Sequence, residues 1–153
     1  MTAMLRLQEM GIELPPAPKP AGSYTRSVQS GRQIYVSGQL PITDGDVVFS
    51  GPVGEGGLTA DQGAQAARLC ALNALSILAE DAGDLERIQI VRMTGYVASA
   101  AGFTSQAQVM NGASELMAAI LGERGIHARV AVGVQGLPLD AAVELEVIAE
   151  VTG

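Results

Sequence analysis

Apolar side chains recur along the chain at two spacings, and these separate the predicted helices from the predicted strands. Between residues 60 and 81, alanines and leucines recur at the spacing of one buried helical face. The stretch "TADQ" (Thr59–Gln62) fits a capping box at the start of this helix, and Gly83 suits its end. A second helix is predicted from about 104 to 121. Its buried face would hold Val109, Met110, Ala113, Leu116, Met117 and Ile120.

Alternating or continuous apolar runs predict the strands. A short strand is expected from about Ile34 to Ser37, and a longer one in "RIQIVRMTGYVAS", where apolar and polar side chains alternate. Two more strands are expected at 129–135 and 142–151, joined by a turn. The segment "DGDVVFSG" is either a hairpin partner of the first strand or an irregular loop.

Prolines and glycines punctuate the rest of the chain. "TAMLRLQEMG" has room for a short N-terminal helix, which Gly11 would end. "LPPAPKPAG" holds four prolines in nine residues and predicts an extended arm. "GPVGEGGL" holds four glycines, but no Gly-Lys-Ser/Thr follows, so we interpret it as a mobile loop and not as a phosphate loop.

The order of these elements predicts one α+β domain over residues 1–153, in which residues 1–21 form the N-terminal helix and arm. A mixed sheet would carry both main helices on one face. On the last two strands the valines are expected to line one side. The other side would mix apolar and charged residues, namely Arg129, Ala131 and Gly133, then Ala142, Glu144, Glu146 and Ile148. Such a face suits neither a dry core nor open solvent, so we expect it to form a subunit interface with a wet pocket.

The composition argues against several functional classes, namely nucleic-acid binding, metal or cofactor sites and membrane association. The net charge is -7 and the nine Lys and Arg residues form no basic stripe, which argues against a DNA or RNA binder. One His and one Cys cannot supply a typical zinc site, so neither a metal nor an organic cofactor is expected. The chain has no signal-peptide pattern and no run of roughly 18 apolar residues. A soluble cytoplasmic protein without membrane association is therefore expected.

Several motifs together resemble the RidA (YjgF/YER057c/UK114) family. They are "GSYTRSV", "IYVSGQLP", "ALNAL", "HARVAVGVQGLP" and "VELEVIAEV", and the resemblance runs from about residue 22 to residue 151. The longer N-terminus and the "LCALNAL" helix resemble a less characterised, endoribonuclease L-PSP-like subgroup. The resemblance implies a chorismate-mutase-like fold and a homotrimer with three clefts between subunits.

The resemblance also implies a site for a small carboxylate-bearing metabolite. Known members hydrolyse enamine and imine intermediates such as 2-aminoacrylate to 2-keto acids and ammonia. Arg129 matches the arginine that grips the substrate carboxylate, and Glu144 matches the carboxylate that positions the attacking water. The residue types suit this chemistry, because a guanidinium binds a carboxylate through two parallel hydrogen bonds and a carboxylate in a cleft exchanges protons.

Other positions match the cleft lining of the family, with two departures. Ala131 stands where a cysteine is frequent, and the usual Pro-Ala-Arg is His-Ala-Arg, with His127 in the place of the proline. These departures are expected to shift the specificity of the pocket. The substrate-binding residues that the resemblance implies are Tyr24, Ser37, Gly38, Asn111 and Ala131.

Structural interpretations compete at several of these positions. Arg129 would serve equally in an ion pair with Glu144, Glu146 or a neighbouring subunit, since charges at interfaces usually pair. The other structural assignments are a loop anchor for Tyr24, a strand-end role for Ser37, a surface or interface role for His127 and a core role for Cys70.

Three functional classes follow from these observations. The first is an imine or enamine hydrolase that removes damaging metabolites. The second is a non-catalytic binding protein for keto acids or amino acids with the same cleft between subunits. The third is the ribonuclease activity that family names carry, which the acidic charge disfavours.

Overall fold

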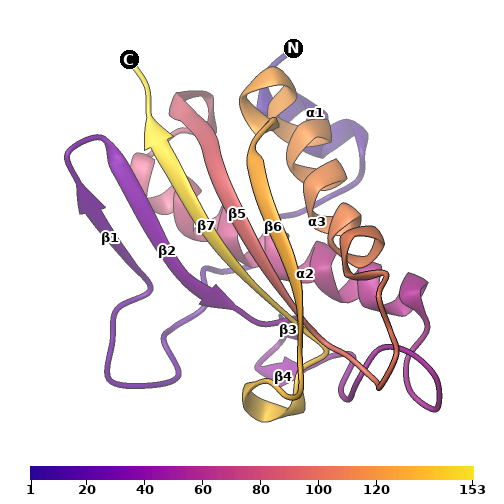
Figure 1. The fold of residues 1–153 in the computed structure, drawn as a ribbon. Helices are drawn as coiled ribbons and strands as arrows, with labels where there is room; N and C mark the ends of the chain where they lie inside the picture. Colours follow the sequence, from indigo (N-terminus) through magenta and orange to yellow (C-terminus); the bar gives the residue numbers. More distant parts are fainter.

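A five-stranded mixed sheet organises the chain, and the computed structural model describes all 153 residues around it. Its strands are β1 (Ser27–Ser30), β2 (Gln33–Gln39), β5 (Ile88–Ala98), β6 (Ala128–Val134) and β7 (Val143–Val151). The order across the sheet is β1-β2-β7-β5-β6 (Figure 1). β6 runs parallel to β5, and every other neighbouring pair is antiparallel.

Two long helices cover one face of this sheet, as the apolar spacing predicts. They are α2 (Ala60–Ala82) and α3 (Gln106–Leu121). Thr59 and Gln62 form the predicted capping box, and Gly83 ends α2 in a left-handed conformation with φ 75°. The expected α+β fold, with both main helices on one face of a mixed sheet, is confirmed.

Small and medium aliphatic side chains fill the space between the helices and the sheet. Met93 of β5 and Met117 of α3 are fully buried there, and so is Cys70, which is the expected core residue. The two helices approach closely at Gly112, where a Cβ atom would lie 2.1 Å from the carbonyl oxygen of Ala64. A chain without Trp can close its core only by such close packing of small residues. No helix combines the length and apolar character that a membrane span requires.

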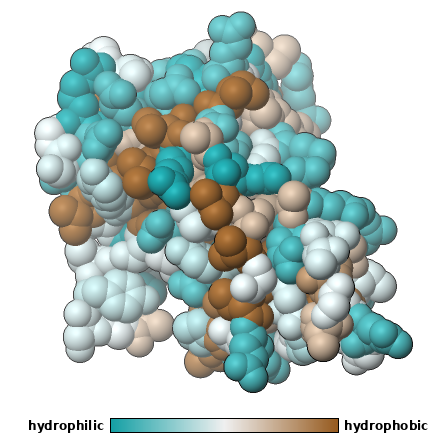
Figure 2. All heavy atoms as spheres, viewed as in Figure 1, coloured by the Kyte–Doolittle hydropathy of each residue, from teal (hydrophilic) through white to brown (hydrophobic).

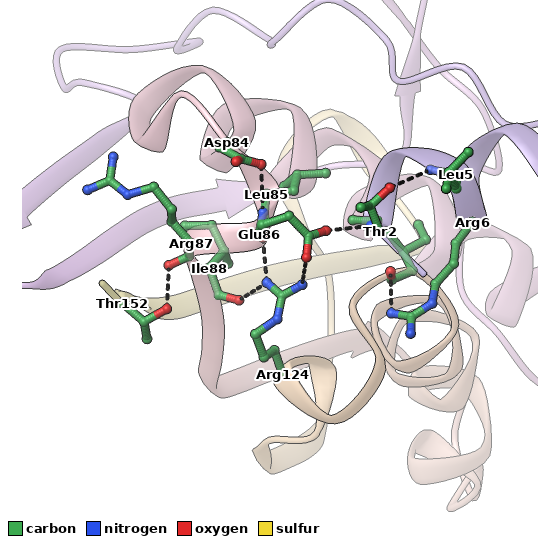
Figure 3. A network of polar contacts seen from close by, with 12 residues as sticks. Thr2, Leu5, Arg6, Asp84, Leu85, Glu86, Arg87, Ile88, Arg124 and Thr152 are labelled. Atoms are coloured by element: carbon green, nitrogen blue, oxygen red, sulfur yellow. Dashed lines mark hydrogen bonds and ion pairs between the residues drawn. The ribbon is translucent and has the colours of Figure 1, made fainter.

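A polar network joins the N-terminal helix α1 (Ala3–Glu9) to the body of the protein (Figure 3). Glu86 accepts a hydrogen bond from the backbone N–H of Ala3 at 2.5 Å and one from the guanidinium of Arg124 at 2.8 Å. Arg6 donates to a backbone carbonyl of α3 at 3.2 Å. The predicted short N-terminal helix is confirmed, and the proline-rich arm starts from this fixed point.

Short elements fill the connections. β3 (Ile42–Thr43) and β4 (Asp46–Val47) form a separate hairpin around Asp44 and Gly45, which both have positive φ, as a two-residue turn requires. The stretch "DGDVVFSG" is therefore half hairpin and half irregular loop, and it does not pair with β2. Single 3₁₀ turns span Leu85–Arg87, Gly122–Gly125 and Pro138–Asp140.

The arrangement of the last two strands differs from the expectation. β6 and β7 are not paired through a turn, because β5 lies between them and hydrogen-bonds to both. β6 is instead an edge strand. β1 was not expected at all, since its sequence "SVQS" is short and mostly exposed at the opposite edge of the sheet.

The faces of β6 are also reversed relative to the expectation. Val130 and Val132 are 40% and 39% exposed on the open face, away from the helices. Arg129 pairs in register with the buried Met93 and turns toward α3, and Ala131 packs against the core on the same side. The apolar sequence of an edge strand does not show which of its two faces the helices cover, because that depends on how the whole chain folds.

The open face of the sheet mixes apolar and charged groups. Glu144 and Glu146 of β7 lie on it beside Tyr96 and Thr94 of β5. Figure 2 shows apolar patches interrupted by polar groups over the side that carries the strands in Figure 1. The exposed large apolar side chains of the open face are Val28, Tyr35, Val130 and Val132. The mixed face that the sequence predicts exists, with β7 contributing to it as expected.

Candidate functional site

Arg129 lies on the edge strand β6, and α3 holds its side chain. Its Nη1 atom donates to Oδ1 of Asn111 at 2.9 Å and to Oγ of Ser114 at 3.0 Å. Its Nη2 atom donates to the carbonyl oxygen of Ala107 at 3.2 Å. Because Asn111 and Ser114 are three positions apart, they project from the same side of the helix. The structure therefore brings two of the predicted site residues, Arg129 and Asn111, into direct contact.

The guanidinium of Arg129 keeps free donors. A guanidinium carries about five N–H donors, and the three contacts above leave one on Nε and one on Nη2. None of the ion pairs in the structure includes Arg129. The competing interpretation of an ion pair with Glu144 or Glu146 in the same chain is therefore wrong. A positive charge with two unused donors remains at an open groove of about 370 Å³.

His127 and Ser114 extend the network behind Arg129. Nδ1 of His127 lies 2.6 Å from the carbonyl oxygen of Gly125, and it carries the proton because a carbonyl only accepts. Nε2 then accepts from the Ser114 hydroxyl at 2.9 Å, while the same oxygen accepts from Arg129. A continuous chain of hydrogen bonds thus holds the guanidinium. His127 is half-buried in this network, which is more than the ordinary surface role expected for it.

Glu144 lies in β7 on the open face, over a bulge of β2. The pairing shifts by one residue between Val36 and Gln39 of β2, which is the stretch that contains Gly38. A Cβ atom at Gly38 would lie 2.1 Å from Oε1 of Glu144. The carboxylate therefore occupies space that only a glycine leaves open.

The surroundings of Glu144 change its acidity. Burial of the half-buried carboxyl raises its pKa above the ordinary value of 4.5, and the nearby negative charge of Glu146 raises the pKa further. Both effects disfavour the charged form. A carboxyl group with a raised pKa is better suited to accept and return a proton near neutral pH.

Tyr24 and Ser37 lie near Gly38, in the loop and strand end beside it. Tyr24 is 53% exposed and borders, with Gly38, a small hollow of about 40 Å³. The Ser37 hydroxyl donates to the carbonyl oxygen of Thr25 at 2.7 Å, which holds the loop that carries Tyr24. Arg26 ties the same loop to α2 through acidic side chains at 2.6 and 3.0 Å. Ser37 thus has the structural contact expected of a strand-end residue.

The predicted site residues form two groups in one chain. The first, which we call the arginine group, comprises Arg129, Asn111 and Ala131 on the helix side of β6. The second, the glutamate group, comprises Glu144, Gly38, Ser37 and Tyr24 around β7 and the end of β2. β5 separates β6 from β7, and Arg129 and Glu144 point to opposite faces of the sheet. The expectation that both charges share one face is wrong.

Cys70 takes no part in either group. Its thiol is fully buried, and its Sγ lies 3.6 Å from the carbonyl oxygen of Val143. Burial first, and then the charge of Glu144, raise the pKa of this thiol well above its ordinary value. A protonated, inaccessible thiol is not a nucleophile. No three His, Cys, Asp or Glu side chains gather closely enough to hold a metal ion.

Near Arg129, Ser114 was not singled out for the site from the sequence, and His127 was noted only as a departure from the family motif. A signal for both was available. His127 stands two positions before Arg129, and Ser114 three positions after Asn111, so each shares a side with a predicted site residue. What the sequence could not show was that these two sides face each other across the β6–α3 contact.

Comparison with known proteins agrees with this fold. The family model described as Endoribonuclease L-PSP matches residues 15–151. Protein TCP17 of Trypanosoma cruzi is 45% identical over 146 residues, which cover 94% of this chain and 91% of that protein. The crystal structure of Atu1372 from Agrobacterium tumefaciens, a protein of unknown function, is 41% identical with a TM-score of 0.90, covering 97% of this chain and 92% of that one.

A RidA structure is also similar, but less so. RidA from the Antarctic bacterium Psychrobacter sp. PAMC 21119 is 28% identical with a TM-score of 0.62, and the match covers 88% of this chain and 94% of that one. The higher TM-score of Atu1372 agrees with the resemblance to a less characterised subgroup. The fold is the chorismate-mutase-like fold of these proteins. Because the family model spans most of the chain, this protein belongs to the endoribonuclease L-PSP family, the family of the RidA (YjgF) proteins.

Proposed function

We propose that this protein hydrolyses small enamine or imine intermediates that carry a carboxylate, releasing a 2-keto acid and ammonia. The observation that carries the proposal is the state of Arg129. Its guanidinium donates three hydrogen bonds to α3, two donors stay free, and no carboxylate of the chain forms an ion pair with it. A fixed guanidinium with two free donors at an open groove is suited to a carboxylate ligand.

The chemistry requires no group beyond this chain's own side chains. An enamine first becomes an imine by gaining a proton on carbon and losing one from nitrogen. A water then adds to the imine carbon, forming a C–O bond, while the nitrogen gains a proton. The resulting carbinolamine loses ammonia as its C–N bond breaks and its C=O bond forms. Glu144 would take the proton of the attacking water and return it to the leaving nitrogen, a role that its raised pKa supports.

A second copy of the chain is needed to complete the site. Arg129 and Glu144 lie on opposite faces of the sheet, so one chain cannot bring both to one small substrate. β6 is an edge strand whose Val130 and Val132 are exposed, which favours association with another chain. In the proposed homotrimer, the arginine group of one copy faces the glutamate group of its neighbour.

A non-catalytic binding protein for keto acids or amino acids is the second candidate. The observation that favours it is that the arginine group is complete within one chain, whereas bringing a glutamate group beside it requires a neighbour. Such a protein would bind a carboxylate without turnover. Ribonuclease activity is the least favoured, because the net charge of -7 repels a phosphate backbone.

A coupled assay separates the two candidates. A dehydratase generates 2-aminoacrylate, and its loss and the appearance of ammonia are followed with and without this protein. The proposal expects faster loss with the wild-type chain and no acceleration with Arg129→Ala. Calorimetric binding of pyruvate by a chain that does not accelerate the loss would favour the binding protein, and absence of both effects would reject the carboxylate site.

A further inference from the structure

A second cavity, of about 430 Å³, lies between the proline-rich arm and the β3–β4 hairpin. Pro15, Pro16 and Pro18 of the arm line it, together with residues of the hairpin and of α2. It adjoins the small hollow that Tyr24 borders, but neither Arg129 nor Glu144 lines it. The volume falls within the usual range of small-molecule pockets. The proposed reaction uses none of its residues.

An amide oxygen without a donor from the protein faces this arm cavity. Asn73 of α2 is only 2% exposed, and its Nδ2 atom donates to the carbonyl oxygens of Leu40 at 3.0 Å and Ile42 at 3.1 Å. Two acceptors on one nitrogen fix the orientation of the amide, because the oxygen cannot donate. Oδ1 of Asn73 receives no hydrogen bond from the protein, and the residue lines the cavity. The floor therefore offers one unused acceptor.

The walls and the rim of the arm cavity define what would fit above this acceptor. The walls are pyrrolidine rings, and proline-rich segments present flat apolar surfaces on which rings pack. The rim carries Lys19 and Asp44, both exposed and neither in an ion pair. The two charges have opposite sign and lie in solvent, so they select no net charge in the ligand.

We infer that the arm cavity is a second binding site, for a neutral ring compound with an N–H donor such as an aromatic carboxamide. The N–H would reach Oδ1 of Asn73, and the ring would lie between the prolines. No fully buried side-chain oxygen lacks a partner, so Oδ1 of Asn73 opens onto the cavity, where a ligand N–H can reach it. An ammonium group fits less well, because the floor holds no carboxylate to pair with it. A carboxylate is excluded at the floor, because two acceptors repel.

The inference gives the N-terminal arm a function in addition to a structural one. Leu14 and Ala17 pack against the core, which fixes the arm, while the prolines between and after them face the cavity. The site stands independently of the reaction proposed above. The proposed active site would bind a carboxylate at Arg129, whereas the arm cavity would bind a carboxamide at Asn73.

A pair of matched probes tests the inference. ¹⁵N-labelled protein is titrated with nicotinamide and, separately, with nicotinate, and the shifted backbone and side-chain amide signals are assigned. Nicotinamide should shift the side-chain amide of Asn73 and the backbone of Thr43 and Gly45 in a saturable way. Nicotinate should leave those signals unchanged, and any shifts it causes around Arg129 report on the proposed active site alone.

Variants of the rim complete the test, because a change at Asn73 itself would also release Leu40 and Ile42. Thr43→Trp fills the mouth of the arm cavity at a strand position, where an aromatic residue is well tolerated. Val48→Trp adds the same ring to an exposed position outside the cavity. Nicotinamide affinity should fall at least tenfold in Thr43→Trp and stay unchanged in Val48→Trp. Unsaturable shifts, shifts away from Asn73, or full binding by Thr43→Trp would overturn the inference, and the cavity would then hold only water.

Discussion

The guanidinium of Arg129 is the residue on which the proposed function depends most. Replacing it with Lys keeps the positive charge but removes the planar fork and the contacts to α3. Arg129→Lys should therefore weaken the binding of pyruvate or 2-ketobutyrate by roughly 1.5–3 kcal/mol, the range for a charge-assisted hydrogen bond. Isothermal titration calorimetry measures this change. Arg32→Lys, at a well-exposed arginine that pairs with Glu150, is the matched control and should leave affinity unchanged.

Gly38 fixes the position of the Glu144 carboxylate. A methyl group in Gly38→Ala would stand 2.1 Å from the present position of Oε1, so the carboxylate must swing away. The glutamate is flexible, and the fold should therefore survive with a nearly unchanged melting temperature. Turnover of 2-aminoacrylate should fall about tenfold or more, as expected when a proton-transfer group is misplaced. Full activity of a folded Gly38→Ala protein would show that the carboxylate position is unimportant.

The raised pKa of Glu144 predicts a pH-dependent effect on stability. Below the ordinary value of 4.5 the carboxyl is protonated in both folded and unfolded chains, and no difference arises. As the pH rises, the unfolded chain loses this proton first, so the folded state becomes relatively less stable. Glu144→Gln should therefore melt at a higher temperature than wild type at neutral pH, and the gap should close in acid. A variant that melts lower at neutral pH would contradict this account.

The family resemblance predicted part of the site. Arg129 and Asn111 were expected to line one cleft, and they hydrogen-bond to each other. The face of the sheet toward which Arg129 points was not predictable. Alternation along a strand separates the side chains into two sets but does not show which set faces a helix. Ser114 and the hydrogen bond of His127 to it were not predicted for the same reason, since both arise only from the contact between β6 and α3.

At the scale of elements, the clearest local signals were also the most reliable. The capping box of α2 and its Gly83 end were read directly from the sequence, because capping depends on neighbouring residues. The pairing of β6 and β7 was misjudged, because strand order depends on contacts that are distant in sequence. β1 was missed because an exposed edge strand of four residues has no apolar pattern.

Substitution of Glu86 tests how much its hydrogen bonds stabilise the attachment of α1 to the rest of the protein. It bonds the backbone of Ala3 and the side chain of Arg124, and both contacts are lost in Glu86→Ala (Figure 3). The variant should be about 1 kcal/mol less stable to urea, with faster hydrogen exchange confined to α1. Glu9→Ala, at an exposed glutamate of the same helix, should change neither quantity. Equal effects of both variants would mean that the bridge contributes little.

At the scale of the whole molecule, the proposed site combines its two groups of residues from more than one chain. The open face exposes Val28, Tyr35 and the valines of β6, which a lone subunit would leave in water (Figure 2). In the proposed homotrimer, association covers this face and the arginine group of one copy faces the glutamate group of the next. Assembly and chemistry are therefore predicted to be coupled.

A mixing experiment tests this coupling most directly. Arg129→Ala and Glu144→Gln chains, each inactive alone, are co-expressed with different tags, and mixed oligomers are purified and assayed with 2-aminoacrylate. If the site is shared in a trimer, about a third of the interfaces in the purified mixed trimers combine an intact Arg129 with an intact Glu144. Turnover should then recover to about that fraction of wild type. Mixed trimers as inactive as their parents, or a monomer mass by light scattering, would contradict the shared site.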